Sequence, residues 1–259
     1  MKIAVTGKGG VGKTTVAALL AALYAEDGRP VLAVDVDPDA NLGLALGFSA
    51  EEMRGVTPVS KLSDLIAERT ASGAEGYGKF FKINPRVSDI PDRFSIERGG
   101  VKLLVMGTVE TGGAGCVCPE HVVLKRVISS LVLDRDEVVI MDMEAGLEHL
   151  GRGTAGMVDA FLVVVEPGAR SVQTYGQIKK LASDLGVTRV RVVANKIRGE
   201  SDRRFIEENI PADDLLGVIS YSDAVIDADR QSVPPAEITG GTRAEIGIIK
   251  EKIDDEKTV

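Results

Sequence analysis

A short segment near the N-terminus carries the clearest chemical pattern in the sequence. Gly7 to Thr14 has the spacing G-x-x-x-x-G-K-[ST], directly after an apolar run and directly before a helical pattern. Glycines in this arrangement let backbone N–H groups point at phosphate oxygens, and the helix start adds a partial positive charge. Lys13 then neutralises the terminal phosphates and Thr14 holds Mg²⁺. The pattern predicts a nucleotide site contacted by Gly9, Gly10, Val11, Gly12, Lys13, Thr14 and Thr15.

Carboxylates follow two further apolar runs and are expected to reach the same site. Asp35 and Asp37 end one of these runs, and alternate residues of an extended chain point to the same face. Hydrolysis of a nucleotide needs such a group to orient the attacking water. Asp142 ends the run 138–141, an arrangement in which the aspartate binds Mg²⁺ directly or through water.

Asn195 ends another apolar run, where related P-loop proteins place an asparagine against the purine. Its amide can donate and accept at once, as adenine recognition demands. GTPases usually follow this asparagine with Lys-x-Asp, whereas Lys196-Ile197-Arg198 follows it here. The missing aspartate favours ATP over GTP.

Cys116 and Cys118 are the two cysteines of the chain, and they lie in a glycine-rich stretch. An extended C-x-C segment places both thiols on one side. Two thiolates are half of a tetrahedral four-sulfur site, and a two-fold dimer would supply the pair twice. We expect a metal site shared by two subunits; packed core thiols and a redox-active dithiol are the alternatives. His121 lies close by and is left out of the ligand set.

The rest of the sequence alternates short apolar runs with helical patterns, which is typical of βαβ units around a buried sheet. We predict an α/β fold of the P-loop NTPase type, with a mostly parallel central sheet and helices on both faces. The expected strands span residues 2–6, 30–35, 101–106, 138–141, 160–165, 190–194 and 216–219. The expected helices span residues 13–26, 61–69, 119–131, 171–185, 201–209 and 242–253.

Composition limits the class of protein. The chain has 259 residues, 44% of them hydrophobic, which suffices for one large core. We expect a single domain over 1–259, with an excursion from the core at about 47–94 where glycines and prolines interrupt the rhythm. The net charge of −8 gives no overall attraction for nucleic acid or anionic lipid. Without a signal peptide or a long apolar run, a cytoplasmic protein is expected.

Lys8 adds a lysine that a general phosphate loop does not require. Over the segment Lys8 to Thr15 the chain resembles the deviant Walker A ATPases, which include the nitrogenase iron protein, MinD and ParA. In that family the signature lysine crosses a two-fold interface to the partner's nucleotide. The resemblance therefore implies an ATP-dependent homodimer in which Lys8 and Lys13 both act on phosphates. It also implies that Asp37 orients the attacking water and that Asp35 lies nearer to Mg²⁺.

The stretch 143–153 after Asp142 is punctuated by glycines and looks like the second switch of that family, which changes shape when the γ-phosphate leaves. Glu144 and His149 lie in this stretch. Charged loops also carry solvated Glu and His without any such role, so the sequence leaves catalysis or metal binding open for both.

The order of the motifs narrows the resemblance to the CooC-type carbon monoxide dehydrogenase maturation ATPases. That order is the phosphate loop, Asp35-x-Asp37-Pro38, Cys116-x-Cys118, Asp142-Met143-Glu144-Ala145-Gly146 and Asn195. These proteins combine the deviant loop with a C-x-C metal site and are implicated in nickel delivery. The resemblance implies an ATP-switched nickel chaperone with carbon monoxide dehydrogenase as its client.

Two other functions stay open on sequence grounds. A MinD-like or ParA-like switch acting on membrane or DNA is disfavoured by the acidic charge and by the lack of a basic amphipathic tail. A reductase resembling the nitrogenase iron protein would hold an iron–sulfur cluster between subunits, but the cysteines of that family stand well apart in sequence. Thiolates accept both Ni²⁺ and Zn²⁺, so the sequence does not choose between them.

Overall fold

The computed structural model of the chain describes residues 1–71, 82–108, 119–133, 135–144, 158–187 and 189–258. Each strand expected from the sequence is present in it. The strands are β1 (Lys2–Gly7), β2 (Val31–Asp35), β3 (Ile96–Arg98), β4 (Val101–Val105), β5 (Val138–Asp142), β6 (Ala160–Val165), β7 (Val190–Ile197) and β8 (Leu215–Ser220).

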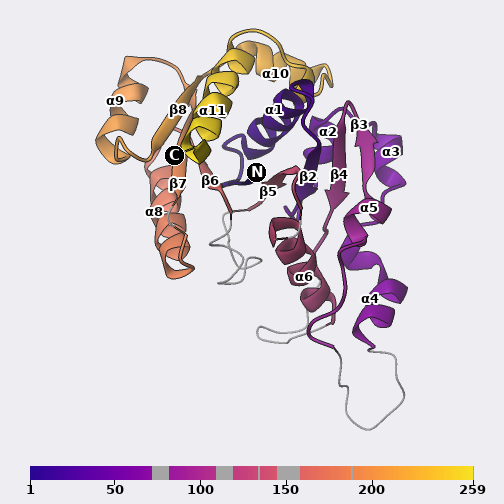
Figure 1. The fold of residues 1–259 in the computed structure, drawn as a ribbon. Helices are drawn as coiled ribbons and strands as arrows, with labels where there is room; N and C mark the ends of the chain where they lie inside the picture. Colours follow the sequence, from indigo (N-terminus) through magenta and orange to yellow (C-terminus); the bar gives the residue numbers. More distant parts are fainter. Residues whose placement is uncertain (72–81, 109–118, 134, 145–157, 188, 259) are drawn as a thin grey trace.

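These described strands form one eight-stranded sheet in the order β3-β4-β2-β5-β1-β6-β7-β8 (Figure 1). Neighbouring strands pair in parallel, except that β3 pairs antiparallel with β4. The chain leaves β1 toward β2 on one side, while β6 lies on the other. In open α/β sheets, ligands bind at the carboxyl ends of the strands where the order reverses in this way. The topology thus places a binding crevice after β1.

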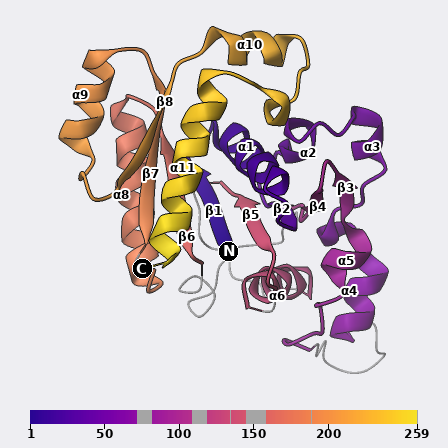
Figure 2. The same ribbon diagram turned by 45° about the horizontal axis from the view of Figure 1, so that its top comes forward.

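Helices cover both faces of the sheet (Figures 1 and 2). The helices that share an apolar cluster on one face are α1 (Lys13–Glu26), α2 (Leu42–Ala45) and α11 (Gly241–Thr258). Those that share the cluster on the other face are α4 (Ser63–Thr70), α5 (Ile90–Phe94), α6 (Pro119–Leu133), α8 (Ala169–Asp184) and α9 (Glu200–Asn209). No helix among the described residues is both long and apolar enough to cross a bilayer.

Helix α1 is a rigid base for the site because it is buried on several sides. Residues 16–21 are all buried, and Tyr24 one turn later is fully buried. The segment consists mostly of alanine and leucine, which favour helix, and a helix that is apolar all round belongs in a core. The first turn of α1 is therefore held firmly against the sheet.

The segment 47–94 contributes to the core where it is described. Val59, Ile66 and Ile90 belong to the same apolar cluster as α6. The segment also contains α3 (Ala50–Arg54) and the 3₁₀ helix η1 (Val59–Lys61). The expected helix over 61–69 is present as α4.

The sequence patterns do not predict β3 or α10 (Asp223–Arg230). β3 has three residues, which is too short for an alternating pattern to be recognised. In α10 the neighbouring apolar residues Val225 and Ile226 would suit a strand equally well. β3 is therefore set by the surrounding structure rather than by a local signal.

Candidate functional site

The loop between β1 and α1 has the backbone conformation that its motif predicts. Gly10 and Gly12 have φ angles of 81° and 98°, a region in which other residues are strained. A Cβ atom on Gly12 would lie 2.4 Å from Nδ2 of Asn195, and one on Gly7 would lie 2.4 Å from the carbonyl oxygen of Val164. Gly7 and Gly12 are thus required by space as well as by backbone angle.

Backbone donors of this loop are available for an anion. Within the described part of the chain, the N–H groups of Gly9, Gly10 and Gly12 donate to no protein group. No side chain caps the start of α1, so its first N–H groups are open too. Successive unpaired N–H groups at a helix start are typical of a phosphate site.

Lys13 and Asp37 lie close together at the phosphate loop. Lys13 is buried in the first turn of α1, and its Nζ lies 3.6 Å from Oδ2 of Asp37. Asp37 follows β2, and the carboxylate balances the charge of the buried ammonium.

Thr14 and Asp142 form the candidate magnesium site. The Thr14 hydroxyl donates to Oδ2 of Asp142 at 2.6 Å, while Oδ1 of Asp142 is buried without a hydrogen-bond partner in the described residues. Burial raises the pKa of Asp142 to about 6, against the lowering effects of the Thr14 hydrogen bond and of Lys13. Hydroxyl and carboxylate oxygens are the ligands Mg²⁺ prefers, so these residues fit the ion. When bound, it would neutralise phosphate charge.

Asp35 shapes the loop that carries Asp37. Its side chain is fully buried and accepts hydrogen bonds from the backbone N–H groups of Leu42 at 2.9 Å and Asp37 at 3.3 Å. Burial raises the pKa of Asp35 to about 7, although the Leu42 hydrogen bond lowers it. Asp35 thus ties the end of β2 to the start of α2 and fixes the backbone of Asp37 between them.

Lys8 and Glu144 follow the neighbouring strands β1 and β5. Lys8 is partly exposed, and its ammonium has no ion pair or hydrogen bond within the residues that the structure describes. Glu144 is exposed, and its backbone carbonyl accepts a hydrogen bond from the Thr6 hydroxyl at 2.7 Å. Both side chains are therefore open to a partner outside this chain's described residues.

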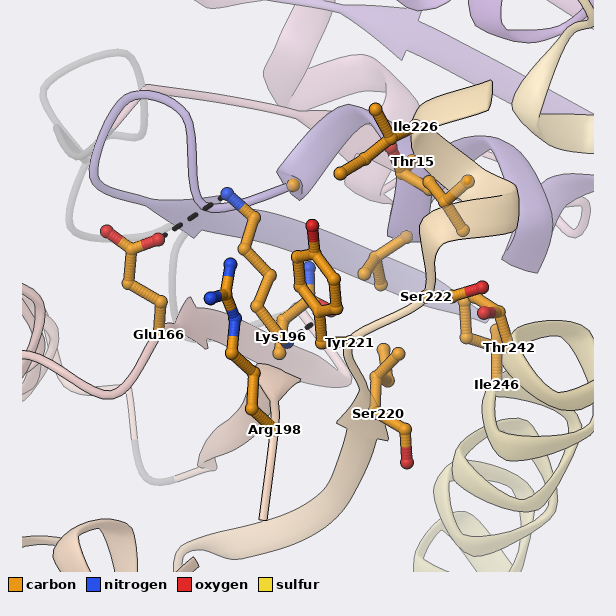
Figure 3. A pocket seen from close by; sticks show the side chains of 15 residues that line it. Thr15, Glu166, Lys196, Arg198, Ser220, Tyr221, Ser222, Ile226, Thr242 and Ile246 are labelled. Carbon is orange, nitrogen blue, oxygen red and sulfur yellow. Dashed lines mark hydrogen bonds and ion pairs between the residues drawn. The ribbon is translucent and has the colours of Figure 1, made fainter. Parts of the chain in front are cut away.

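A cavity of about 400 Å³ opens beside the phosphate loop (Figure 3). The Arg198 guanidinium lies over the Tyr221 ring, 4.1 Å from its centroid, at one wall of this cavity. An apolar pocket with a few polar groups at its edge suits a planar nucleobase. Its apolar lining consists of Val16, Ile219, Val225, Ile226 and Ile246.

Asn195 lines this cavity, but its side-chain amide already makes two hydrogen bonds within the protein. Its Nδ2 donates to the carbonyl oxygen of Val11 at 2.8 Å, and its Oδ1 accepts from the N–H of Lys196 at 2.8 Å. One N–H and one lone pair remain for a base. Asn195 therefore has a role in holding the loop that its sequence position alone does not indicate.

The predicted metal ligands Cys116 and Cys118 lie outside the described residues, as does His149. His121 lies in the first turn of α6 and is partly buried. Among the described residues there is no group of three or more His, Cys, Asp or Glu side chains that suits a metal ion. The expected C-x-C site therefore stays a prediction.

Sequence reasoning did not single out several residues of the cavity. Glu166 follows β6, and Tyr221 follows β8, so both stand at carboxyl strand ends like the residues that were predicted. Their position directly after an apolar run is the sequence feature by which they could be predicted. Nothing in the sequence around Lys196 indicates that its side chain reaches the phosphate loop.

Comparisons with known proteins agree with this geometry. Residues 2–235 match the model of the CobQ/CobB/MinD/ParA nucleotide binding domain. The chain is 45% identical to the carbon monoxide dehydrogenase accessory protein CooC of Rhodospirillum rubrum, covering 94% of this chain and 92% of the relative. It is 47% identical to an uncharacterized ATP-binding protein of Methanocaldococcus jannaschii, covering 88% of each chain.

A solved structure supports the fold. The chain is similar to the MinC:MinD cell division protein complex of Aquifex aeolicus with a TM-score of 0.69 and 16% identity, covering 98% of this chain and 96% of that one. At this identity the likeness speaks for the architecture alone. Together with the family match and the geometry of the loop, it identifies the chain as a member of the CobQ/CobB/MinD/ParA nucleotide-binding family and as a P-loop ATPase.

Proposed function

We propose that this ATPase is a dimeric metallochaperone that assists nickel insertion into carbon monoxide dehydrogenase. The observation that carries the proposal is the 45% identity with the accessory protein CooC over 94% of the chain, in a sequence that also has the Cys116-x-Cys118 pair. Nickel is the cargo of this activity, and ATP hydrolysis drives the change between the states that hold and release it.

The hydrolytic step is assigned to residues after β1 and β2. ATP phosphates entering the loop offer Lys13 a competing anion, which frees the Asp37 carboxylate to accept a hydrogen bond from the attacking water. Lys13 then stabilises the negative charge that develops on the transferred phosphoryl group. The 3.6 Å distance between the two side chains supports this exchange.

Dimer closure is assigned to Lys8. Its ammonium is partly exposed and has no partner among the described residues, so it is available to a nucleotide on a facing subunit. A two-fold interface would then place each Lys8 at the partner's phosphates. ATP binding and association of the subunits would be thermodynamically linked, because each favours the other.

Coupling between ATP and metal is supported by the strands that flank the cysteine stretch. The described residue before this stretch, Thr108, follows β4, which pairs with β2. At the end of that pair, the N–H of Met106 donates to the carbonyl of Asp35 at 2.9 Å. A change in the loop after β2 on hydrolysis would therefore act directly on the strand that leads to Cys116 and Cys118.

Anaerobic nickel titration with parallel sedimentation tests the proposal. We expect about one nickel ion per dimer, as for a site built from two thiolates of each subunit, and loss of binding in the Cys116→Ser, Cys118→Ser double variant. Lys8→Ala should keep ATP binding but lose ATP-driven dimerisation. Unchanged nickel binding in the double variant would refute the thiolate site. A brown protein after anaerobic purification would point to an iron–sulfur cluster in its place.

A further inference from the structure

Two consecutive side chains at the end of β7 hold two consecutive carbonyl oxygens of the phosphate loop. Asn195 Nδ2 donates to the Val11 carbonyl at 2.8 Å, and Lys196 Nζ donates to the Gly10 carbonyl at 2.6 Å. We call Asn195 and Lys196 the carbonyl clamp. The clamp joins the cavity of Figure 3, which both residues line, to the loop that receives the phosphates.

The backbone at the clamp is unusual for these residue types. Lys196 has φ of 61°, a left-handed conformation that is unfavourable for a lysine. The pairing of β7 with β8 shifts register between Ala194 and Ile197, so the clamp residues occupy the irregularity. A strained backbone persists only where the surroundings hold it, and such positions cluster at functional sites. The shift lets neighbouring residues reach toward the same loop, where a regular strand would alternate them.

Glu166 pairs with the end of the lysine. Its carboxylate lies 3.4 Å from Lys196 Nζ (Figure 3), and its own backbone N–H donates to the Ser171 hydroxyl at 3.0 Å. Lys196 is thus held between the carboxylate and the Gly10 carbonyl. This arrangement directs one N–H of the ammonium at the loop.

The geometry of the peptide bond indicates how the clamp orients the N–H groups of the phosphate loop. A trans peptide is planar, so its carbonyl and its N–H point in opposite directions. Holding the Val11 carbonyl toward β7 directs the N–H of Gly12, which is unpaired within the described residues, away from β7. Holding the Gly10 carbonyl does the same for the N–H of Val11, which donates to the Lys8 carbonyl at 3.5 Å within the loop. If either peptide flipped, a carbonyl dipole would face the phosphates and repel them. Glycines at 10 and 12 make such flips easy in an unrestrained loop.

We propose that Lys196, with Asn195 beside it and Glu166 as its anchor, is a positioning residue that preorganises the phosphate loop for nucleotide binding. The clamp fixes the loop before the ligand arrives, so less order has to be imposed on binding. This inference rests on the assignment of residues 7–15 as the phosphate site and is independent of nickel.

Lys196→Gly is the informative variant, because glycine accepts the left-handed backbone without strain while removing the lysine hydrogen bond to the Gly10 carbonyl. The probes are MgATP and magnesium tripolyphosphate, which fills the phosphate site without entering the cavity. We expect both to bind the variant about tenfold to a hundredfold more weakly, in line with the loss of a hydrogen bond from a charged donor. The KM for ATP should rise by a similar factor while kcat changes less. The free energy of unfolding should not fall.

Arg170→Ala is the matched control for charge. Arg170 is an exposed cation in the first turn of α8, shortly after Glu166, and its side chain makes no hydrogen bond or ion pair with the described residues. Its removal should weaken tripolyphosphate binding less than twofold, an estimate for one screened surface charge. An equal loss of tripolyphosphate affinity in both variants would mean that Lys196 acts only through its positive charge. That result would overturn the proposal.

Two other results decide the matter. If Lys196→Gly weakens ATP but not tripolyphosphate, Lys196 contacts the base and the clamp is refuted. If the wild-type protein binds ATP but not tripolyphosphate, the phosphate-site assignment and the clamp both fail. Neither outcome bears on nickel binding by Cys116 and Cys118, which the cysteine variant tests separately.

Discussion

The hydroxyl of Thr14 lies 2.6 Å from Oδ2 of Asp142, joining the start of α1 to the end of β5. The other oxygen of this carboxylate is buried and has no partner in the described part of the chain. A buried carboxylate that lacks one hydrogen-bond partner is costly, and a cation offsets that cost. The pair is thus arranged for a third participant that brings positive charge.

Asp142→Asn should reduce MgATP hydrolysis by about 100-fold or more, the usual cost of removing one group that stabilises developing charge. The amide is neutral, so its oxygen is a weaker ligand for Mg²⁺ than the carboxylate. Hydrolysis measured over a range of Mg²⁺ concentrations should also show a higher Mg²⁺ requirement. Asp136→Asn, an exposed change just before β5, is the control and should behave as wild type. An unaltered Mg²⁺ requirement in Asp142→Asn would remove this residue from the metal site.

Asp37→Asn should bind MgATP as tightly as the wild type while hydrolysing it about 100-fold more slowly, because orientation of the attacking water is lost. Asp39→Asn provides the comparison, since Asp39 is exposed and contributes its backbone N–H to Asp37 rather than its carboxylate. Single-turnover hydrolysis would measure the chemical step. Equal rates in Asp37→Asn and wild type would exclude Asp37 from hydrolysis.

Gly12→Ala should abolish nucleotide binding, because the new Cβ would meet the Asn195 amide at 2.4 Å and φ is 98°. Gly28→Ala separates the two causes. Its φ is 75°, but no atom lies within 4 Å of the added Cβ. We expect Gly28→Ala to lose about 1–2 kcal/mol of unfolding free energy from backbone strain alone, with ATP affinity intact. Calorimetric ATP titration and urea unfolding would measure the two effects. Equal ATP affinities in both alanine variants would contradict the steric argument.

The Asp89 carboxylate should make stability depend on pH in the acid range. Arg69 donates to it at 3.0 and 2.8 Å and lowers the pKa of Asp89 to about 2. The unfolded chain has a pKa near 3.9, so the folded state binds this proton less readily. The stabilisation is therefore complete above about pH 4 and is lost as the pH falls toward about 2.

Asp89→Asn should cost about 1 kcal/mol at neutral pH, a value reduced for the partial exposure of the pair. The difference from wild type in urea unfolding should shrink as the pH is lowered from about 5 to about 3. A constant difference for Asp89→Asn across this range would mean that the ion pair is not its source.

The sequence predicts the parts of this molecule that depend on local pattern. The phosphate loop can be recognised because its glycines, Lys13 and Thr14 have a fixed spacing between a strand and a helix. Asp37 and Asp142 can be placed near it because carboxyl ends of parallel strands meet at one edge of a sheet. The strands themselves are nearly continuous apolar runs, since the sheet is covered on both faces.

Other contacts depend on geometry that no local pattern encodes. The reach of Lys196 to Gly10 follows from a left-handed residue within a register shift, and lysine gives no sign of either. The stack of Arg198 on Tyr221 joins the ends of β7 and β8, which are set by sheet order. The purine-reading role predicted for Asn195 likewise took no account of its bond to Val11.

The sheet order separates the cavity from the strand that leads toward the cysteine stretch. The cavity lies at β6, β7 and β8, whereas β4, which leads toward the cysteine stretch, lies on the far side of β2 and β5. With strands about 4.8 Å apart, β4 is about 14 Å from β1. The cavity and the cysteine stretch are therefore reached from opposite sides of β1, and the strands that carry Asp37 and Asp142 lie between β1 and β4. Because both cysteines belong to the single connection between β4 and α6, substitutions there can accumulate during evolution without changing the strands that build the cavity.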